Sequence, residues 1–73
     1  MTLSSTAKSI IKGNKELRIA LIANNGNVSR VTMHNWLNDN SENNPLLLAK
    51  NIHTIIEYTG LTYEQIINQT VNV

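Results

Sequence analysis

The apolar residues of this 73-residue chain recur at helical spacing, and polar or glycine-containing stops divide them into five segments. No stretch shows the apolar–polar alternation of a half-buried strand. This pattern predicts a compact all-α domain of five helices. A chain of this length forms one domain with a small core, so residues 1–73 are assigned to a single unit. The tail 69–73 carries no clear signal and is expected to fray.

Capping residues set the expected helix boundaries. The predicted N-caps are Asn14, Ser29, Asn44 and Thr62, and the predicted left-handed stops are Gly13 and Gly60. Pro45 after Asn44 is a typical first helical residue, and Thr62 with Gln65 has the spacing of a capping box. The expected helices therefore span 5–12, 15 to 23–25, 29–38, 45–59 and 62–68.

The apolar periodicity also predicts which side chains are buried. The inward face of the second helix is expected to hold Leu17, Ala20, Leu21 and either Ala23 or Asn24. The stripe predicted for the fourth helix is Leu48, Ala49, Ile52, Ile55 and Ile56, with Asn51, Thr54 and Glu57 facing outward.

The leucine run 46–48 holds more apolar residues than one buried stripe needs. Leu46 or Leu47 is therefore expected at the surface beside Ile66, Ile67 or Tyr63, which favours a homodimer slightly. The alternative is that these residues fill the local core around the fifth helix.

Charge is distributed unevenly along the chain, although its formal net value is only +1. Residues 1–38 carry five Lys and Arg against Glu16, whereas residues 39–73 carry Lys50 against four Asp and Glu. This asymmetry favours an anionic partner for the first half, with chance as the alternative. Lys8 and Lys12 share one side of the first helix, where phosphate contact and simple solubility are equally good explanations.

The segment 29–38 divides into two faces on a helical wheel. The inward face holds Met33, Trp36 and Leu37; the outward side holds Val31, His34, Asn35 and Asn38, with Arg30 at its edge and Ser29 at its tip. Asn can pair with adenine, Arg can pair with guanine, and an exposed Val can contact a thymine methyl group. Ser29 and the free amides at the helix start can hold a phosphate, and Lys15 and Arg18 can flank the backbone.

The order of residues around this segment resembles the helix-turn-helix of prokaryotic and phage regulators of the lambda-repressor and Cro type. That family has a small residue four positions before the turn residue, an apolar residue six positions after it, and an apolar pair three positions later. The matching positions here are Ala23, Asn27, Met33 and the pair Trp36-Leu37, within a longer run that includes Val28-Ser29 and Thr32. The resemblance covers roughly residues 14–68 when the two following helices are included.

The resemblance implies sequence-specific binding of double-stranded DNA by a small phage or bacterial transcriptional regulator, with 29–38 as the recognition helix in the major groove. Ser29, Arg30, Val31, His34, Asn35 and Asn38 are the implied DNA-binding residues, with Lys15 and Arg18 beside them. Met33, Trp36 and Leu37 are expected to pack this helix onto the second and fourth helices. The family usually has Gly at the turn after a large apolar residue. Asn27 and Gly26 stand there instead, which predicts either a hole in the core or an early end of the second helix.

Other function classes find little support in the sequence. There is no cysteine, the two histidines lie far apart, and no glycine-rich phosphate loop or nucleophile–base set is present, so we expect no metal, cofactor, small-molecule substrate or enzymatic activity. No signal-peptide or membrane-length apolar run is found, which favours a cytoplasmic protein without a membrane partner. Two alternatives stay open: a DNA-binding adaptor in phage packaging, replication or recombination, and a helical protein-interaction module.

Overall fold

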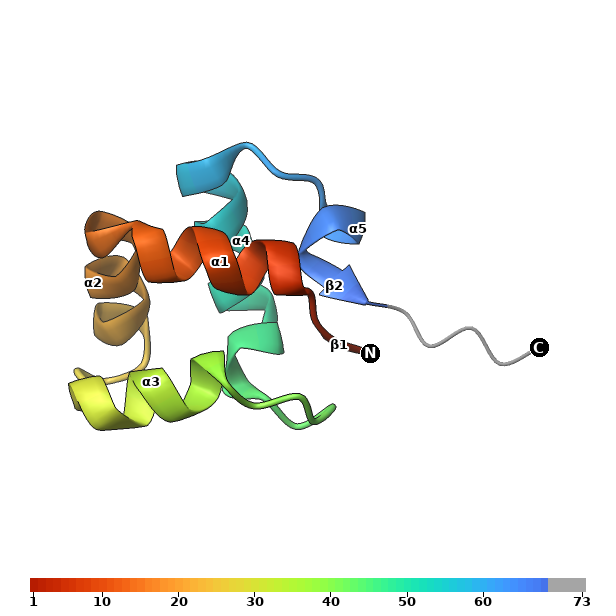
Figure 1. Ribbon diagram of the computed structural model, residues 1–73. Helices are drawn as coiled ribbons and strands as arrows, with labels where there is room; N and C mark the ends of the chain where they lie inside the picture. Colours follow the sequence, from red (N-terminus) through yellow and green to blue (C-terminus); the bar gives the residue numbers. More distant parts are fainter. Residues whose placement is uncertain (69–73) are drawn as a thin grey trace.

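A computed structural model describes residues 1–68. Within this range the chain forms five α-helices, a 3-10 helix and two short strands (Figure 1). They are β1 (Thr2–Leu3), α1 (Ser5–Gly13), α2 (Lys15–Asn24), α3 (Arg30–Leu37), η1 (Pro45–Leu47), α4 (Ala49–Thr59), α5 (Tyr63–Ile66) and β2 (Ile67–Asn68). The predicted all-α class is confirmed for the described part of the chain. The predicted fraying of 69–73 lies outside the described residues.

A core built mainly of Leu and Ile side chains joins the helices, with Met33 buried in it and Trp36 packed against it. Helix α1 crosses the centre of the molecule, with α2 at one end of it and α3 along the lower edge in Figure 1. The side chains that are completely buried include Ala7, Ile11, Leu17, Leu21, Leu46, Ile55 and Ile66. Ala20 is only half-buried and both Ala23 and Asn24 are exposed, so the inward face of α2 is narrower than its periodicity predicts.

The strands at the two ends of the described chain were not expected from the sequence. They pair antiparallel, with Thr2 opposite Asn68 and Leu3 opposite Ile67. The predicted fifth helix therefore ends at Ile66 rather than Asn68. Because each strand has two residues, neither is long enough for alternation to appear in the sequence.

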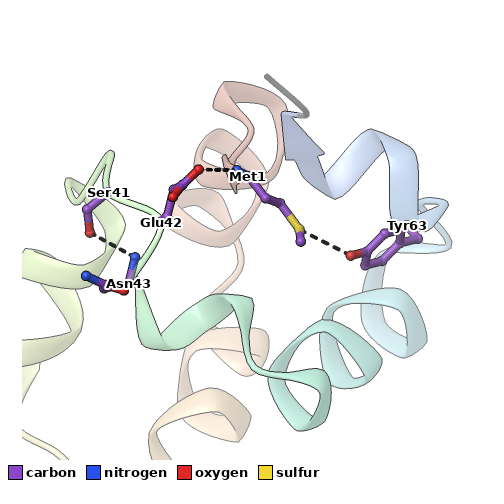
Figure 2. A network of polar contacts seen from close by, with 5 residues as sticks. All are labelled: Met1, Ser41, Glu42, Asn43 and Tyr63. Carbon is purple, nitrogen blue, oxygen red and sulfur yellow. Dashed lines mark hydrogen bonds and ion pairs between the residues drawn. The ribbon is translucent and has the colours of Figure 1, made fainter. Parts of the chain in front are cut away.

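Side chains extend the association of these ends to the loop after α3. The Met1 ammonium group lies 3.0 Å from Glu42 Oε1, and the Tyr63 hydroxyl donates to Met1 Sδ at 3.2 Å (Figure 2). Both pairs are exposed, so each adds little to the free energy of unfolding. Their geometry nevertheless places the loop 39–44 beside Met1.

The turn between α2 and α3 is built on two consecutive left-handed residues. Gly26 has a φ of 76° and Asn27 a φ of 59°. The Asn27 amide donates to Ile22 O at 2.9 Å and the Gly26 amide to Ala23 O at 3.4 Å, which is the Schellman pattern of helix ends. Gly26 is exposed and a Cβ there would meet nothing within 4 Å, so the position faces open space and the predicted core hole is not found. Helix α2 ends at Asn24, within the predicted range of 23–25.

Alanine substitutions at Gly13 and Gly26 are expected to change the free energy of unfolding in opposite directions. Gly13 belongs to α1 and has no positive φ, so the predicted left-handed stop there is wrong. Gly13→Ala should raise the free energy of unfolding by about 0.5–1 kcal/mol, because alanine loses less backbone entropy in a helix. Gly26→Ala should lower it by about 1–2 kcal/mol, because only the left-handed backbone opposes the new Cβ. Thermal unfolding of both variants measures the difference, and equal shifts would contradict the assigned backbone conformations.

The predicted helix 45–59 is interrupted at Leu48. The residue is extended, with a ψ of 144°, and separates η1 from α4. Asn51 explains the break: its Nδ2 donates to Pro45 O at 2.8 Å, and the Leu48 amide donates to the same oxygen at 3.1 Å. A continuous helix would pair Pro45 O with the Ala49 amide instead. A local side-chain hydrogen bond has thus displaced a helical one.

Two burial predictions for this segment are therefore wrong. Asn51, expected to face outward, is completely buried, while Leu48 is 52% exposed and Ala49 is exposed. Ile52 and Ile55 are buried as predicted, and Gly60 is left-handed with a φ of 72°.

The surface predicted for a homodimer is also different. Leu46, Ile66 and Ile67 are buried and Leu47 is half-buried, so these residues belong to the local core. Tyr63 is exposed as predicted, and Leu48 joins Met1 at a groove of about 650 Å³. The homodimer remains a prediction, because most of the apolar residues expected to form its surface belong to the core.

Candidate nucleic-acid interface

The start of α3 is fixed by Ser29, as predicted. Its Oγ accepts from the Thr32 amide at 3.1 Å and donates to Thr32 Oγ1 at 3.0 Å. The hydroxyl therefore caps the helix, and both groups lie near the surface.

The end of α3 is fixed by a buried asparagine that the sequence suggested only as a cap. Asn44 is 2% exposed, and its Nδ2 donates to Trp36 O at 2.7 Å and to Asp39 O at 3.0 Å. Its Oδ1 accepts from the Leu46 amide at 3.0 Å. One side chain thus holds the last turn of α3, the following loop and η1 in a fixed relation.

Lysines of α1 contact the loop that follows α3. Lys12 Nζ donates to Asn38 Oδ1 at 3.2 Å, and Lys8 Nζ donates to Asn40 Oδ1. Hydrogen bonds from Ser41 hold the pKa of Asp39 below its ordinary value, and the Lys8 charge adds to this effect. The Asp39 carboxylate accepts from the Ser41 amide at 2.8 Å.

The two predicted faces of α3 are confirmed. Met33 and Leu37 are buried and Trp36 is half-buried, whereas Arg30, His34, Asn35 and Asn38 are exposed and Val31 is 70% exposed. The buried face packs against α1 and η1. The expected packing onto the predicted fourth helix is found at η1, the start of that segment, whereas the edge of α3 toward α2 borders an open groove.

This groove, called the α2–α3 groove below, has a volume of about 520 Å³. Its basic lining comes from three helices: Lys12, Lys15, Arg18, Arg30 and His34. Its apolar lining is Ile19, Ile22, Met33 and Leu37. No carboxylate is among these residues, so the groove has a positive electrostatic potential. Such a potential favours the binding of a phosphate group.

Arg18 has a structural role in addition to its charge. Its Nη1 donates to Ile11 O at 3.0 Å and also to Lys12 O. The guanidinium therefore caps the C-terminal end of α1, where a cation is favoured by the helix dipole. Its other N–H groups give it further donor capacity beside the groove.

His34 and Asn38 form a local pair one helical turn apart. Asn38 Nδ2 lies 3.1 Å from His34 Nε2 and donates to His34 O at 3.1 Å. Together with the bond from Lys12, these contacts orient the Asn38 amide. Asn35 and Val31 stand on the more open part of the same helix.

The structure thus brings the predicted residues into two adjoining surfaces. Lys15, Arg18, Arg30 and His34 line the groove, and Val31, Asn35 and Asn38 continue from it across the exposed face of α3. Ser29 lies at the tip of α3. The sequence does not distinguish Lys12 from Lys8, because both share one side of α1. In the structure Lys12 lines the groove, whereas Lys8 does not.

No group of three or more His, Cys, Asp or Glu side chains in residues 1–68 is placed to hold a metal ion. None of the helices described is long and apolar enough to cross a membrane. Comparisons with protein-family models, with curated proteins and with solved structures each give no match to this chain.

Proposed function

We propose that this protein binds double-stranded DNA in a sequence-specific manner, as a small transcriptional regulator that places α3 in the major groove. The observation that carries the proposal is the convergence of cations from α1, α2 and α3 beside the exposed polar face of one short helix. The resemblance to the lambda-repressor and Cro type supports the same assignment.

In protein–DNA interfaces some side chains contact base edges and others contact phosphates, and the geometry provides residues for both. An α-helix with its side chains is about 10–12 Å in diameter, which fits the width of the major groove, and the eight residues of α3 provide about two turns for contact. Asn35 and Arg30 would contact base edges, and Val31 would contact a thymine methyl group. Lys12 and Lys15 would hold phosphates and set the register of the helix on the duplex.

Both ends of α3 are held by the rest of the domain. A helix held in this way is better suited to base recognition than a loosely held surface helix. Ser29 caps its first turn and Asn44 holds its last turn to η1. Base recognition requires side chains that are held in place by the scaffold, and both ends of α3 meet this requirement.

Selection of bound sequences from a random DNA pool tests the proposal. The protein should enrich one short motif at low salt, and Asn35→Ala should lose preference at one base pair, by about 1–3 kcal/mol of discrimination. Asn43→Ala, an exposed change in the loop after α3, is the matched control and should keep the full motif. Absence of enrichment by a folded protein would refute DNA recognition, and an unchanged motif in Asn35→Ala would remove Asn35 from the contact surface.

A further inference from the structure

The apolar part of the α2–α3 groove is not accounted for by DNA binding. Ile19 is 55% exposed and Ile22 is half-buried, and both lie on the α2 side of the groove opposite Met33. A phosphate backbone carries charge and is strongly hydrated, so it would leave this apolar surface without a partner. Among the large apolar side chains of the described chain, Ile19 is one of few that are more than half exposed.

The basic part of the groove stands next to this apolar surface rather than on a separate face. Lys15 and Arg30 are exposed and come from different helices, and Lys12 enters from α1. Like charges that converge without a carboxylate among the lining residues favour an anion between them. The groove volume, about 520 Å³, lies within the range of small-molecule sites.

From this combination we infer that the α2–α3 groove binds a small amphipathic anion, with one phosphate, sulfonate or carboxylate group on a compact aromatic or aliphatic body. The anionic group accepts hydrogen bonds from Lys15 and Arg30, and the body covers Ile19 and Ile22. The occupant is a small soluble molecule rather than a macromolecule, because the apolar lining is limited to four side chains and shares the groove with the cations.

Such a ligand would act on DNA binding through shared residues. It neutralises Lys15 and Arg30, the cations through which the proposed function contacts DNA, so ligand and duplex compete. This second step rests on the proposed function, whereas ligand binding itself does not.

A titration with 1-naphthyl phosphate tests the site, with inorganic phosphate and 1-naphthol as comparators. Methyl signals of Ile19, Ile22 and Met33 in nuclear magnetic resonance spectra should shift saturably with 1-naphthyl phosphate. 1-Naphthol, which lacks the charge, should bind at least about tenfold more weakly. Inorganic phosphate should leave the methyl signals unchanged.

Variants separate the groove from general surface binding. Lys15→Gln combined with Arg30→Gln should weaken 1-naphthyl phosphate about tenfold, while Lys50→Gln, an exposed cation on α4 outside the groove, should have no effect. Equal affinity for inorganic phosphate, or shifts unaffected by the double variant, would overturn the inference. Because these measurements contain no DNA, they stand even if the protein fails to enrich a motif. If a motif is enriched, displacement of the labelled duplex by 1-naphthyl phosphate is the expected result, and lack of displacement would overturn the competition step.

Discussion

Replacement of Asn51 by leucine, which has the same branched shape but larger methyl groups, is expected to lower the free energy of unfolding by about 3 kcal/mol. Asn51 is completely buried and donates to Asn25 Oδ1 at 3.1 Å and to Pro45 O at 2.8 Å. It also accepts from Asn25 Nδ2 at 2.9 Å. Leucine removes these three hydrogen bonds in a region with little access to water. Pro45 O keeps the Leu48 amide and Asn25 Nδ2 keeps Leu21 O, but Asn25 Oδ1 is left without its donor, and such a stranded group costs about 1–3 kcal/mol. Because Asn25 is half-buried, its side chain can bond to water in the variant, which reduces the loss of stability.

Thermal and urea unfolding measure this effect. A shift of about 4–8 °C per kcal/mol is expected for a domain of this size, so the midpoint should fall by more than 10 °C. Asn43→Ala, in the exposed loop, is the control and should change the midpoint little. A loss below about 1 kcal/mol in Asn51→Leu would show that the polar pair does not hold α4 to the turn after α2.

A double variant separates stranded hydrogen bonds from packing. In Asn25→Ala with Asn51→Leu, the Asn25 amide is no longer present to lose its partner. The combined loss should therefore be smaller than the sum of the single losses by about 1 kcal/mol. Additive losses would instead assign the effect of Asn51→Leu to packing and to the lost bond with Pro45 O rather than to the pairing with Asn25.

The buried asparagines show why part of this fold was predictable and part was not. Asn14, Ser29 and Thr62 accept hydrogen bonds from amides within three residues, and such local caps are visible in the sequence. Asn51 instead pairs with Asn25, 26 residues away, and with Pro45 O. Asn51 was placed on the outer face because it is polar, although at 100° per residue it stands only about 40° from Ile55 on the helical wheel. Its burial is explained by these hydrogen-bond partners, and the pairing with Asn25 cannot be read from a local pattern.

The same contrast holds for the candidate interface. The exposed face of α3 was predicted because its residues lie within two turns of one helix. The α2–α3 groove was not, because Lys12, Lys15 and Arg30 come from three helices whose mutual angles are set by the core. The sequence signals for it were the uneven charge of the two chain halves and the expectation that Lys15 and Arg18 flank the DNA backbone. Gly26 illustrates a local signal that was misassigned: it was compared with an apolar family position, whereas its backbone serves as the left-handed end of α2.

Removal of two groove cations is expected to weaken DNA binding uniformly across sequences, by roughly 10- to 100-fold at moderate salt. Lys12→Gln with Lys15→Gln deletes two phosphate contacts of the proposed complex but leaves Asn35 and Arg30 in place. Fewer counterions are then released from the duplex, so the slope of log affinity against log salt should become shallower by about 2. Binding to a labelled duplex at four or more salt concentrations measures both quantities.

Matched variants at other cations distinguish contacts to phosphates from contacts to base edges. Lys50→Gln removes the same charge from α4, outside the groove, and should leave the slope unchanged. Arg30→Gln should relax preference at one base pair, because a paired contact with guanine is lost. The protein-interaction alternative predicts no dependence on these cations in any DNA measurement. An equal effect of Lys50→Gln would show that attraction to the duplex is spread over the surface rather than directed by the α2–α3 groove.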